Sequence, residues 1–331
     1  MLYRCPVDTA VMKASLCAVL VSAAAGAACY QPANRTVLPS AVPAAPRLIR
    51  VGIVDGGQTT IRRVPLEEYV EATVLSEFAP PGGDPGVVER MLEVQAVIGR
   101  TYAVAHIARH AHQGFDLCAT THCQLFQPSR LRNSRWAPQA AVAVRRTAGT
   151  ILWYDGGPAR ALFHADCGGH TSSAVDVWGG TARPYLVARA DDGPAGDVHA
   201  AWRFEASRSA VQRALNADPR TRIGARLDGI QVLDRDQAGR AERIALHGAQ
   251  DRVVRGEPLR EVLAQAFGGR AIKSTWFDVR PERTLFVFEG RGFGHGVGLC
   301  QAGALARIRA GAKPAAVLQR YYPGTKLVAI R

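Results

Sequence analysis

Hydrophobic and polar residues alternate along residues 47–64, on both sides of an Asp55-Gly56-Gly57 turn. Alternation with a period of two around such a turn predicts a β-hairpin. Pro65 suits the first position of a helix, and residues 66–78 then run without a breaker until Pro80-Pro81. This region is therefore expected to be a hairpin that leads into a helix.

Further elements follow along the chain. Residues 87–109 predict a second, longer helix, and strand-like segments come at 149–154, 160–164 and 284–288. Helices are expected to begin near Gln301 and Pro314. Residues 200–280 mix both patterns and carry many charges but few chemical signals, so we expect a supporting subdomain within a domain that spans residues 47–331.

The N-terminal residues have a different pattern. An apolar run from Ala14 to Ala28 is too short to span a bilayer, which takes roughly twenty residues. It predicts an export signal over residues 1–29. The sequence Gly-Ala-Ala-Cys ending at Cys29 fits a lipoprotein processing site, which would anchor the protein to a membrane; plain signal-peptidase cleavage is the alternative. Residues 30–46 are rich in proline and are expected to form a tether.

Composition and charge narrow the class of protein. The chain has 331 residues, a formal net charge of +13 and 47% hydrophobic residues. These values exclude collagen-like, coiled-coil and disordered chains, and the charge favours an anionic polymer as partner. The export signal and the lack of a recognisable nucleic-acid module argue against nucleic acid. We therefore expect a periplasmic or cell-envelope protein.

Glu77 is the unusual carboxylate of the first predicted helix. On a wheel of about 100° per residue it falls in the arc of Leu66, Val70 and Thr73, whereas the other glutamates fall elsewhere. A carboxyl group on the apolar side loses hydration, which raises its pKa and favours the protonated form that a general acid needs. The alternative is a solvated Glu77 in a frayed last turn.

Two other segments carry polar residues in unusual places. Gln95 lies in an apolar stripe of the second predicted helix, where a bond to backbone in the core is the alternative to a ligand contact. Glycine alternates with other residues over 290–298, and an extended ribbon of this kind would present one bare backbone face, with His295 on the opposite face. His295 is then a substrate-binding, proton-transfer or purely structural group. The glycine spacing does not match a dinucleotide-binding fingerprint.

Cysteine and histidine gather in two places. An even number of cysteines remains after the leader, as an oxidising compartment favours: Cys118, Cys123, Cys167 and Cys300. The first group, whose ligand types suit tetrahedral zinc, consists of His112, Cys118, His122 and Cys123. A Cys118–Cys123 disulfide is the alternative there. The second group is His164, Cys167 and His170, in which Cys167 can instead pair with Cys300.

Six ordered segments carry a resemblance to a known family. They are residues 64–77, 95–102, 121–124, 147–152, 163–171 and 292–304. Together with a closing Tyr-Tyr-Pro-Gly-Thr they cover nearly the whole chain after the leader. Their content and order resemble the stage II sporulation protein D (SpoIID/LytB) family.

The resemblance implies a function and a fold. It implies a peptidoglycan lytic transglycosylase that cuts between N-acetylmuramic acid and N-acetylglucosamine, preferably on strands without stem peptides, and leaves 1,6-anhydro ends. The family's catalytic glutamate corresponds to Glu77, and the chemistry requires no cofactor. The implied fold is α+β, with helices packed against antiparallel strands around a glycan groove, and the periodicities agree with it. The residues assigned to substrate binding are Gln95, Arg100, Tyr102, His164, His170, Arg291, His295 and Gln301.

The sequence departs from the family pattern at two cysteines, and the branches of the family offer alternative functions. Cys167 and Cys300 stand where serine is usual, near the groove, and we predict that they form a disulfide. Zinc-bearing members have Cys and His in the loop that matches residues 112–123. The amidase-enhancer branch gives the alternative function, a non-enzymatic wall-binding modulator of a cell-wall amidase. A zinc hydrolase is a third possibility, but no evident base accompanies an open metal site.

Overall fold

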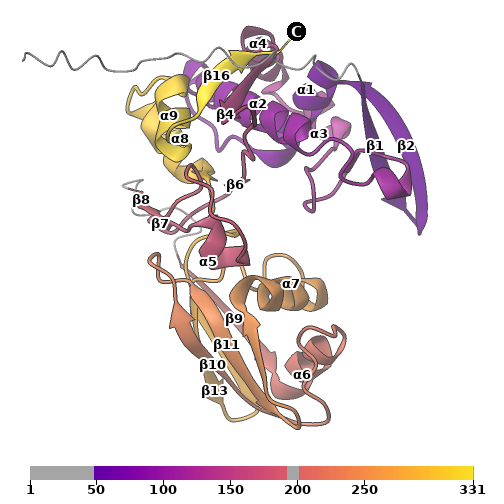
Figure 1. Ribbon diagram of the computed structural model, residues 1–331, viewed down its shortest axis with the longest axis vertical. Helices are drawn as coiled ribbons and strands as arrows, with labels where there is room; N and C mark the ends of the chain where they lie inside the picture. Colours follow the sequence, from indigo (N-terminus) through magenta and orange to yellow (C-terminus); the bar gives the residue numbers. More distant parts are fainter. Residues whose placement is uncertain (1–47, 192–200, 331) are drawn as a thin grey trace, which may run out of the picture. The chain divides into compact units, whose positions relative to one another are not determined.

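The computed structural model of the chain describes residues 48–191 and 201–330 (Figure 1). These residues all lie in the unit Ser40–Arg331. The predicted export signal, the lipid on Cys29 and the proline-rich tether lie outside these residues. No helix within the described ranges is both long and apolar enough to cross a membrane.

The predicted hairpin is confirmed. Strands β1 (Leu48–Asp55) and β2 (Gln58–Pro65) pair antiparallel with Asp55 opposite Gln58. Gly56 and Gly57 form the two-residue turn with φ of 54° and 83°, a backbone conformation that glycine adopts without steric cost. A short strand, β3 (Leu117–Cys118), pairs parallel with β1 and brings the Cys/His loop to this sheet.

Two helices follow the hairpin as expected. Helix α1 (Leu66–Glu77) begins one residue later than predicted, because Pro65 is its N-cap rather than its first helical residue. Helix α2 (Pro85–Ala105) begins after Asp84, whose side chain accepts a hydrogen bond from the Val87 N–H at 2.8 Å. The middle of α2 is buried almost all round, since α1, α4, α8 and α9 pack against it.

The remaining elements of this first core come from both halves of the chain. They are η1 (Ala111–Gln113), α3 (Pro128–Arg132), α4 (Ala137–Arg146), β4 (Thr150–Tyr154), β5 (Gly157–Pro158), β6 (Phe163–His164), β7 (His170–Thr171), α5 (Ala174–Trp178), β8 (Arg189–Ala190), β15 (Leu299–Cys300), α8 (Gln301–Arg309), α9 (Pro314–Tyr321) and β16 (Lys326–Ala329). Strand β16 pairs antiparallel with β4, and β15 pairs parallel with β6. These pairings bring the C-terminal helices beside α2.

Residues 202–290 build a second apolar core of their own. Its elements are β9 (Trp202–Ser207), α6 (Arg208–Asn216), β10 (Leu227–Arg235), β11 (Ala241–Gly248), β12 (Arg252–Arg255), α7 (Gly256–Phe267), β13 (Phe277–Glu282) and β14 (Leu285–Gly290). They form two antiparallel three-stranded sheets, β10-β11-β12 and β13-β14-β9. This region spans the range predicted for a supporting subdomain and runs about ten residues beyond its predicted end; the supporting role stays a prediction. Helices and small, mainly antiparallel sheets confirm the α+β class.

Candidate functional site

Glu77 is the last residue of α1 and is half-buried. Its Oε1 accepts a hydrogen bond from the main-chain N–H of Leu125. Burial raises the pKa of Glu77 to about 7, although the Leu125 N–H and the positive charge of Arg130 act in the opposite direction. The side chain therefore lies toward the apolar side, as the helix wheel predicts, and holds a proton near neutral pH. Its catalytic role remains a prediction.

The segment that carries the Leu125 N–H is fixed on both sides. The Oε1 of Gln124 accepts a hydrogen bond from the Tyr69 hydroxyl at 3.1 Å, and both side chains are fully buried. On the other side, the Gln127 N–H donates to Ser76 Oγ at 3.0 Å. Residues 124–127 therefore run along the C-terminal end of α1. Sequence reasoning missed Leu125, because a main-chain donor has no side-chain signature.

Hydrogen bonds link three of the predicted site residues, Glu77, Gln95 and Gln301. Gln301, the first residue of α8, donates from Nε2 to Gln95 Oε1 at 3.0 Å and to the Glu77 carbonyl oxygen at 3.3 Å. Gln95 and Gln301 are both buried. This geometry makes them positioning residues for the end of α1. Gln95 bonds inside the core, but to a side chain rather than to backbone.

A pocket of about 400 Å³ lies beside the end of α1. Its lining combines residues on either side of Glu77 with residues of α3 and the turn after it: Leu75, Ala79, Pro80, Ser129, Arg130, Asn133, Ser134 and Trp136. Arg130 donates to the Ser76 carbonyl at 3.1 Å, which keeps its cation next to the carboxyl group. Arg130 could not be singled out from the sequence, because arginine is common throughout the chain.

His164 and His295 lie close together, as expected, with ring centroids 5.5 Å apart. Burial lowers the pKa of His295 to about 4 and that of His164 well below its usual value, so both rings are neutral at pH 7. His295 Nδ1 accepts the Val297 N–H at 3.0 Å, and its ring lies 5.0 Å from that of Trp178, which is 41% exposed. Trp178 was missed by the sequence analysis.

The glycine segment before β15 is not the extended ribbon that its spacing suggests. Gly292, Gly294, Gly296 and Gly298 all have positive φ, between 73° and 104°. A side chain at 296 would overlap the guanidinium of Arg240, and one at 298 would overlap the Leu162 carbonyl. The glycines are therefore needed for close approach by several neighbouring segments.

Two assignments to substrate binding need correction. Arg100 is fully buried, and its guanidinium holds both carboxylate oxygens of Glu67, at 2.8 and 2.5 Å. Tyr102 is buried, its hydroxyl accepts from Arg109 at 2.9 Å, and its ring stacks on His106 at 4.0 Å. Both residues are buried and held by neighbouring side chains, so they stabilise the core around α2.

The other two assigned residues lie closer to the surface. Arg291 is exposed, and its guanidinium stacks over the Trp276 ring at 3.4 Å. His170 is half-buried in β7, with Nδ1 2.7 Å from the Thr171 carbonyl.

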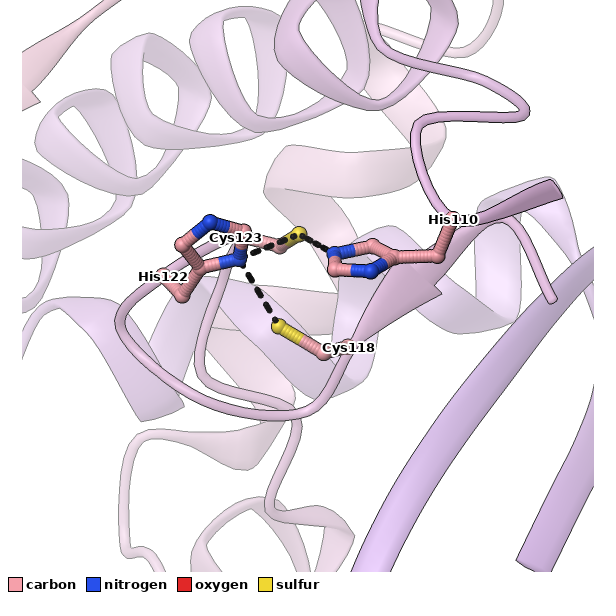
Figure 2. Close-up of side chains that lie close together, drawn as sticks. All are labelled: His110, Cys118, His122 and Cys123. Atoms are coloured by element: carbon pink, nitrogen blue, oxygen red, sulfur yellow. Dashed lines mark hydrogen bonds between the residues drawn. The ribbon is translucent and has the colours of Figure 1, made fainter. Parts of the chain in front are cut away.

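The first Cys/His cluster contains His110 in place of His112 (Figure 2). The ligand atoms of His110, Cys118, His122 and Cys123 all lie within 4.8 Å of one another. His110 Nε2 is 3.3 Å from Cys123 Sγ, and His122 Nδ1 is 3.6 and 3.8 Å from the sulfurs of Cys118 and Cys123. His112 is exposed, because the η1 turn carries it out of the cluster.

Three relatives are similar to most of this chain. A protein of Brachyspira hyodysenteriae without a functional name is 28% identical over 273 residues, which is 81% of this chain and 68% of that protein. Stage II sporulation protein D of Bacillus subtilis is 25% identical over 292 residues, 84% of this chain and 79% of the relative. The amidase enhancer of Bacillus subtilis is 25% identical over 281 residues, 71% of this chain and 37% of the enhancer.

Residues 54–154, which include α1, α2 and the Cys/His loop, match the SpoIID domain, described as a stage II sporulation protein. This match and the named relatives support a relationship to the SpoIID family. The domain match and the two named relatives support a role connected with the cell wall. Residues 195–298 match a second domain, DUF8618, whose function is unknown, and this match coincides with the second apolar core.

The four-residue cluster of this SpoIID domain fits zinc. Zinc–sulfur bonds of about 2.3 Å and zinc–nitrogen bonds of about 2.0 Å in a tetrahedron place sulfur and nitrogen about 3.5 Å apart, close to the separations in the cluster. Gln113 Oε1 lies 2.8 Å from His110 Nδ1, which leaves Nε2 of that ring free for a metal. A hydrogen bond between the two thiols lowers the pKa of Cys118 and raises that of Cys123.

Neither predicted disulfide is present in the structure. All four described cysteines are free and buried. Cys118 and Cys123 instead face the two histidines, and the sulfur of Cys300 accepts the Cys167 N–H at 3.2 Å while the Cys167 thiol donates to Asp191.

Proposed function

We propose that this protein is a peptidoglycan lytic transglycosylase that cleaves the bond between N-acetylmuramic acid and N-acetylglucosamine. One observation carries the proposal: a half-buried carboxyl group at Glu77, with its pKa raised to about 7, beside a pocket. The resemblance of the motifs around Glu77 to those of the SpoIID family supports the substrate class. Glycan strands without stem peptides are the preferred substrate.

A single carboxyl group suffices for this reaction. Protonated Glu77 donates its proton to the glycosidic oxygen, and the bond from that oxygen to muramic C1 breaks. The muramic C6 hydroxyl oxygen then attacks C1, and its proton passes to the Glu77 carboxylate. The products are a free sugar hydroxyl and a 1,6-anhydro end, so no water is consumed and the enzyme is regenerated. The raised pKa of Glu77 serves the first step, because the acid must hold a proton when substrate binds.

Neighbouring groups keep the carboxyl group in place. The Leu125 N–H leaves Glu77 Oε1 occupied, so Oε2 is the atom available to the substrate. Gln301 fixes the main chain at Glu77 from the opposite side. Arg130 contributes a positive charge that limits the rise of the Glu77 pKa, which allows the carboxylate to form in the second step.

The Cys/His cluster would hold zinc in a structural role. His110, Cys118, His122 and Cys123 fill all four tetrahedral positions, so a bound metal would have no open position for substrate. Bound zinc would cross-link the loop that leads directly to Gln124 and Leu125. The cluster therefore supports the main-chain donor on which the acid depends.

The amidase-enhancer relative supports a second candidate function. In that case the same pocket binds glycan and the protein modulates a separate cell-wall amidase without cutting the strand. In both cases we propose export to the periplasm or cell envelope, where a lipid on Cys29 would anchor the protein to a membrane. The net charge of +13 suits binding to anionic wall polymer.

Mass spectrometry of the reaction products tests the proposal. Purified protein and its Glu77→Gln variant are incubated with intact and with amidase-stripped peptidoglycan strands. We expect 1,6-anhydro-muramyl products from the wild type and none from the variant, which keeps the shape of the side chain. Binding of strands by both proteins without products from either would favour the amidase modulator.

A further inference from the structure

A second group of thiol and imidazole side chains lies apart from the loop cluster. His164, Cys167 and Cys300 are all buried, and their ligand atoms lie within 4.8 Å of one another. Strand pairing explains the proximity, because β15 runs parallel to β6 with Cys300 opposite His164. The proposed cleavage reaction assigns no proton transfer to these three side chains.

The imidazole of His164 has an unused nitrogen. Nδ1 lies 3.1 Å from the Val297 carbonyl oxygen and therefore carries the proton that donates to it. Nε2 is buried and has no hydrogen-bond partner among the described residues. A buried lone pair without a donor is unfavourable, so this nitrogen is expected to have a ligand. The neutral ring is also the form that binds metals.

Main-chain N–H groups point at both sulfur atoms. Cys167 Sγ accepts from the Gly169 N–H at 3.3 Å. Cys300 Sγ accepts from the Cys167 N–H at 3.2 Å and from the Gly303 N–H at 3.3 Å, and it forms the N-cap of α8. The Cys167 thiol donates to Asp191 Oδ2 at 3.4 Å, and Cys167 and burial raise the pKa of Cys300. A bound cation would displace the thiol protons, and the N–H donors and the helix N-terminus would then stabilise the thiolates that ligate it.

The groups around the cluster favour a cationic ligand. Arg240 is buried and donates to the Cys167 carbonyl at 2.8 Å, while Asp191 pairs with Arg307 at 2.7 Å. Asp236 and Glu257 interact with Arg240 and offset its charge. Two buried thiolates would therefore need a cation between them, because uncompensated buried charge is unfavourable.

We propose that His164, Cys167 and Cys300 form a binding site for a soft monovalent d10 cation, Cu⁺, in trigonal coordination. Two thiolates and one imidazole without a fourth donor suit Cu⁺, because thiolate ligands select soft cations. The cation joins the end of β6 to the start of α8. Gln301 follows Cys300 directly and bonds the Glu77 carbonyl, so the site would also hold the element that positions the carboxyl group.

A Cys167–Cys300 disulfide is the competing chemistry. Oxidation of the two thiols would connect the same segments, but it would leave His164 Nε2 without a partner. The cation explains all three side chains, and the two states have different masses and different thiol counts.

Cu⁺ titration of the full mature chain tests the site. The protein is reduced, freed of reductant under anaerobic conditions and titrated with Cu⁺ against a Cu⁺-specific chelator, with native mass spectrometry as the readout. A Cys118→Ser/Cys123→Ser background removes the loop cluster. In that background we expect one Cu⁺ per chain, and none after Cys167→Ser/Cys300→Ser. His164→Ala should weaken binding by at least about tenfold.

His170→Ala is the matched control, because it removes a nearby histidine outside the cluster and should leave the affinity for Cu⁺ unchanged. Circular dichroism shows whether each variant is folded. In the wild type, bound Cu⁺ should protect the thiols from alkylation, which gives a second readout. Failure of the reduced, folded background variant to bind Cu⁺ would overturn the proposal. A loss of two hydrogens from the mass of the isolated protein, without Cu⁺ binding after reduction, would assign the pair to a disulfide. Neither result depends on whether the protein cleaves glycan.

Discussion

The main-chain N–H of Leu125 donates to Oε1 of Glu77 and thereby joins the Cys/His loop to the end of α1. The bond stabilises the carboxylate, while burial favours the protonated form, and burial has the larger effect. The result is a pKa of about 7, at which both protonation states are populated in the cell. An acid that must first give and then accept a proton works best in this range.

The pH dependence of cleavage follows from this pKa. We expect kcat/KM to fall about tenfold per pH unit above pH 7, because the free enzyme then loses the proton that it must donate. Release of anhydro-muramyl products from denuded strands, measured between pH 5 and 9, checks this limb. A rate that stays constant up to pH 9 would exclude Glu77 as the acid.

Ionisation of Glu77 lowers the stability of the folded state, whereas ionisation of a salt-bridged carboxylate raises it. The pKa of Glu77 rises from 4.5 to about 7 on folding, so the folded state binds the proton more tightly. Stability is therefore lost as pH rises from about 4.5 to 7. Glu77→Gln removes the titration, and we expect it to raise the free energy of unfolding at pH 8 by about 1–2 kcal/mol relative to wild type. Urea unfolding at pH 5 and pH 8 measures the difference, and equal effects at both pH values would contradict the burial argument.

Arg130 tunes the acid from the rim of the pocket. Arg130→Gln removes a positive charge that lowers the pKa of Glu77, so the alkaline limb of the rate profile should move up by about half a pH unit. Arg132→Gln is the matched control, because Arg132 lies on the same short helix and is also exposed. Equal shifts in the two variants would point to net charge rather than to the position of Arg130.

Zinc affinity shows which of two neighbouring histidines, His110 or His112, is the fourth metal ligand. His110→Ala should lower the affinity for zinc by at least about tenfold, whereas His112→Ala should leave it unchanged. Zinc content after competition with a chelator is the measurement. Chelation of the wild type should also slow glycan cleavage, since the loop that carries the Leu125 N–H would lose its cross-link. Loss of zinc from the His112 variant alone would restore the assignment made from the sequence.

Arg100 is expected to act on stability and not on substrate. Arg100→Met removes the bidentate bond to Glu67 and the bond to the Thr150 carbonyl, and should lower the free energy of unfolding by about 2–3 kcal/mol. Glu67→Gln should cost less, because Glu67 is 40% exposed and its side chain can be solvated. Affinity for glycan strands, measured well below the unfolding temperature, should be the same in both variants. Weakened binding with unchanged stability would reverse this assignment.

Periodicity predicted those features that depend on one element at a time. The hairpin turn at Gly56-Gly57 and the position of Glu77 on the apolar side of α1 follow from local spacing, and the structure has both. Local spacing carries no signal for the ion pair of Arg100, because its partner Glu67 lies on another helix. His110 and His112 were indistinguishable, since only the turn of η1 decides which ring faces the thiols.

The pairing of β16 with β4 has a consequence for how the chain folds. Trp153 lies opposite Lys326, so an N-terminal core that includes α2 is closed by a strand made much later. Contacts so distant in sequence slow folding, because a long loop must close before they form. During synthesis this core therefore stays incomplete until residues 326–329 have emerged. A chain that folds this late stays unfolded for longer, which would suit the export that we propose.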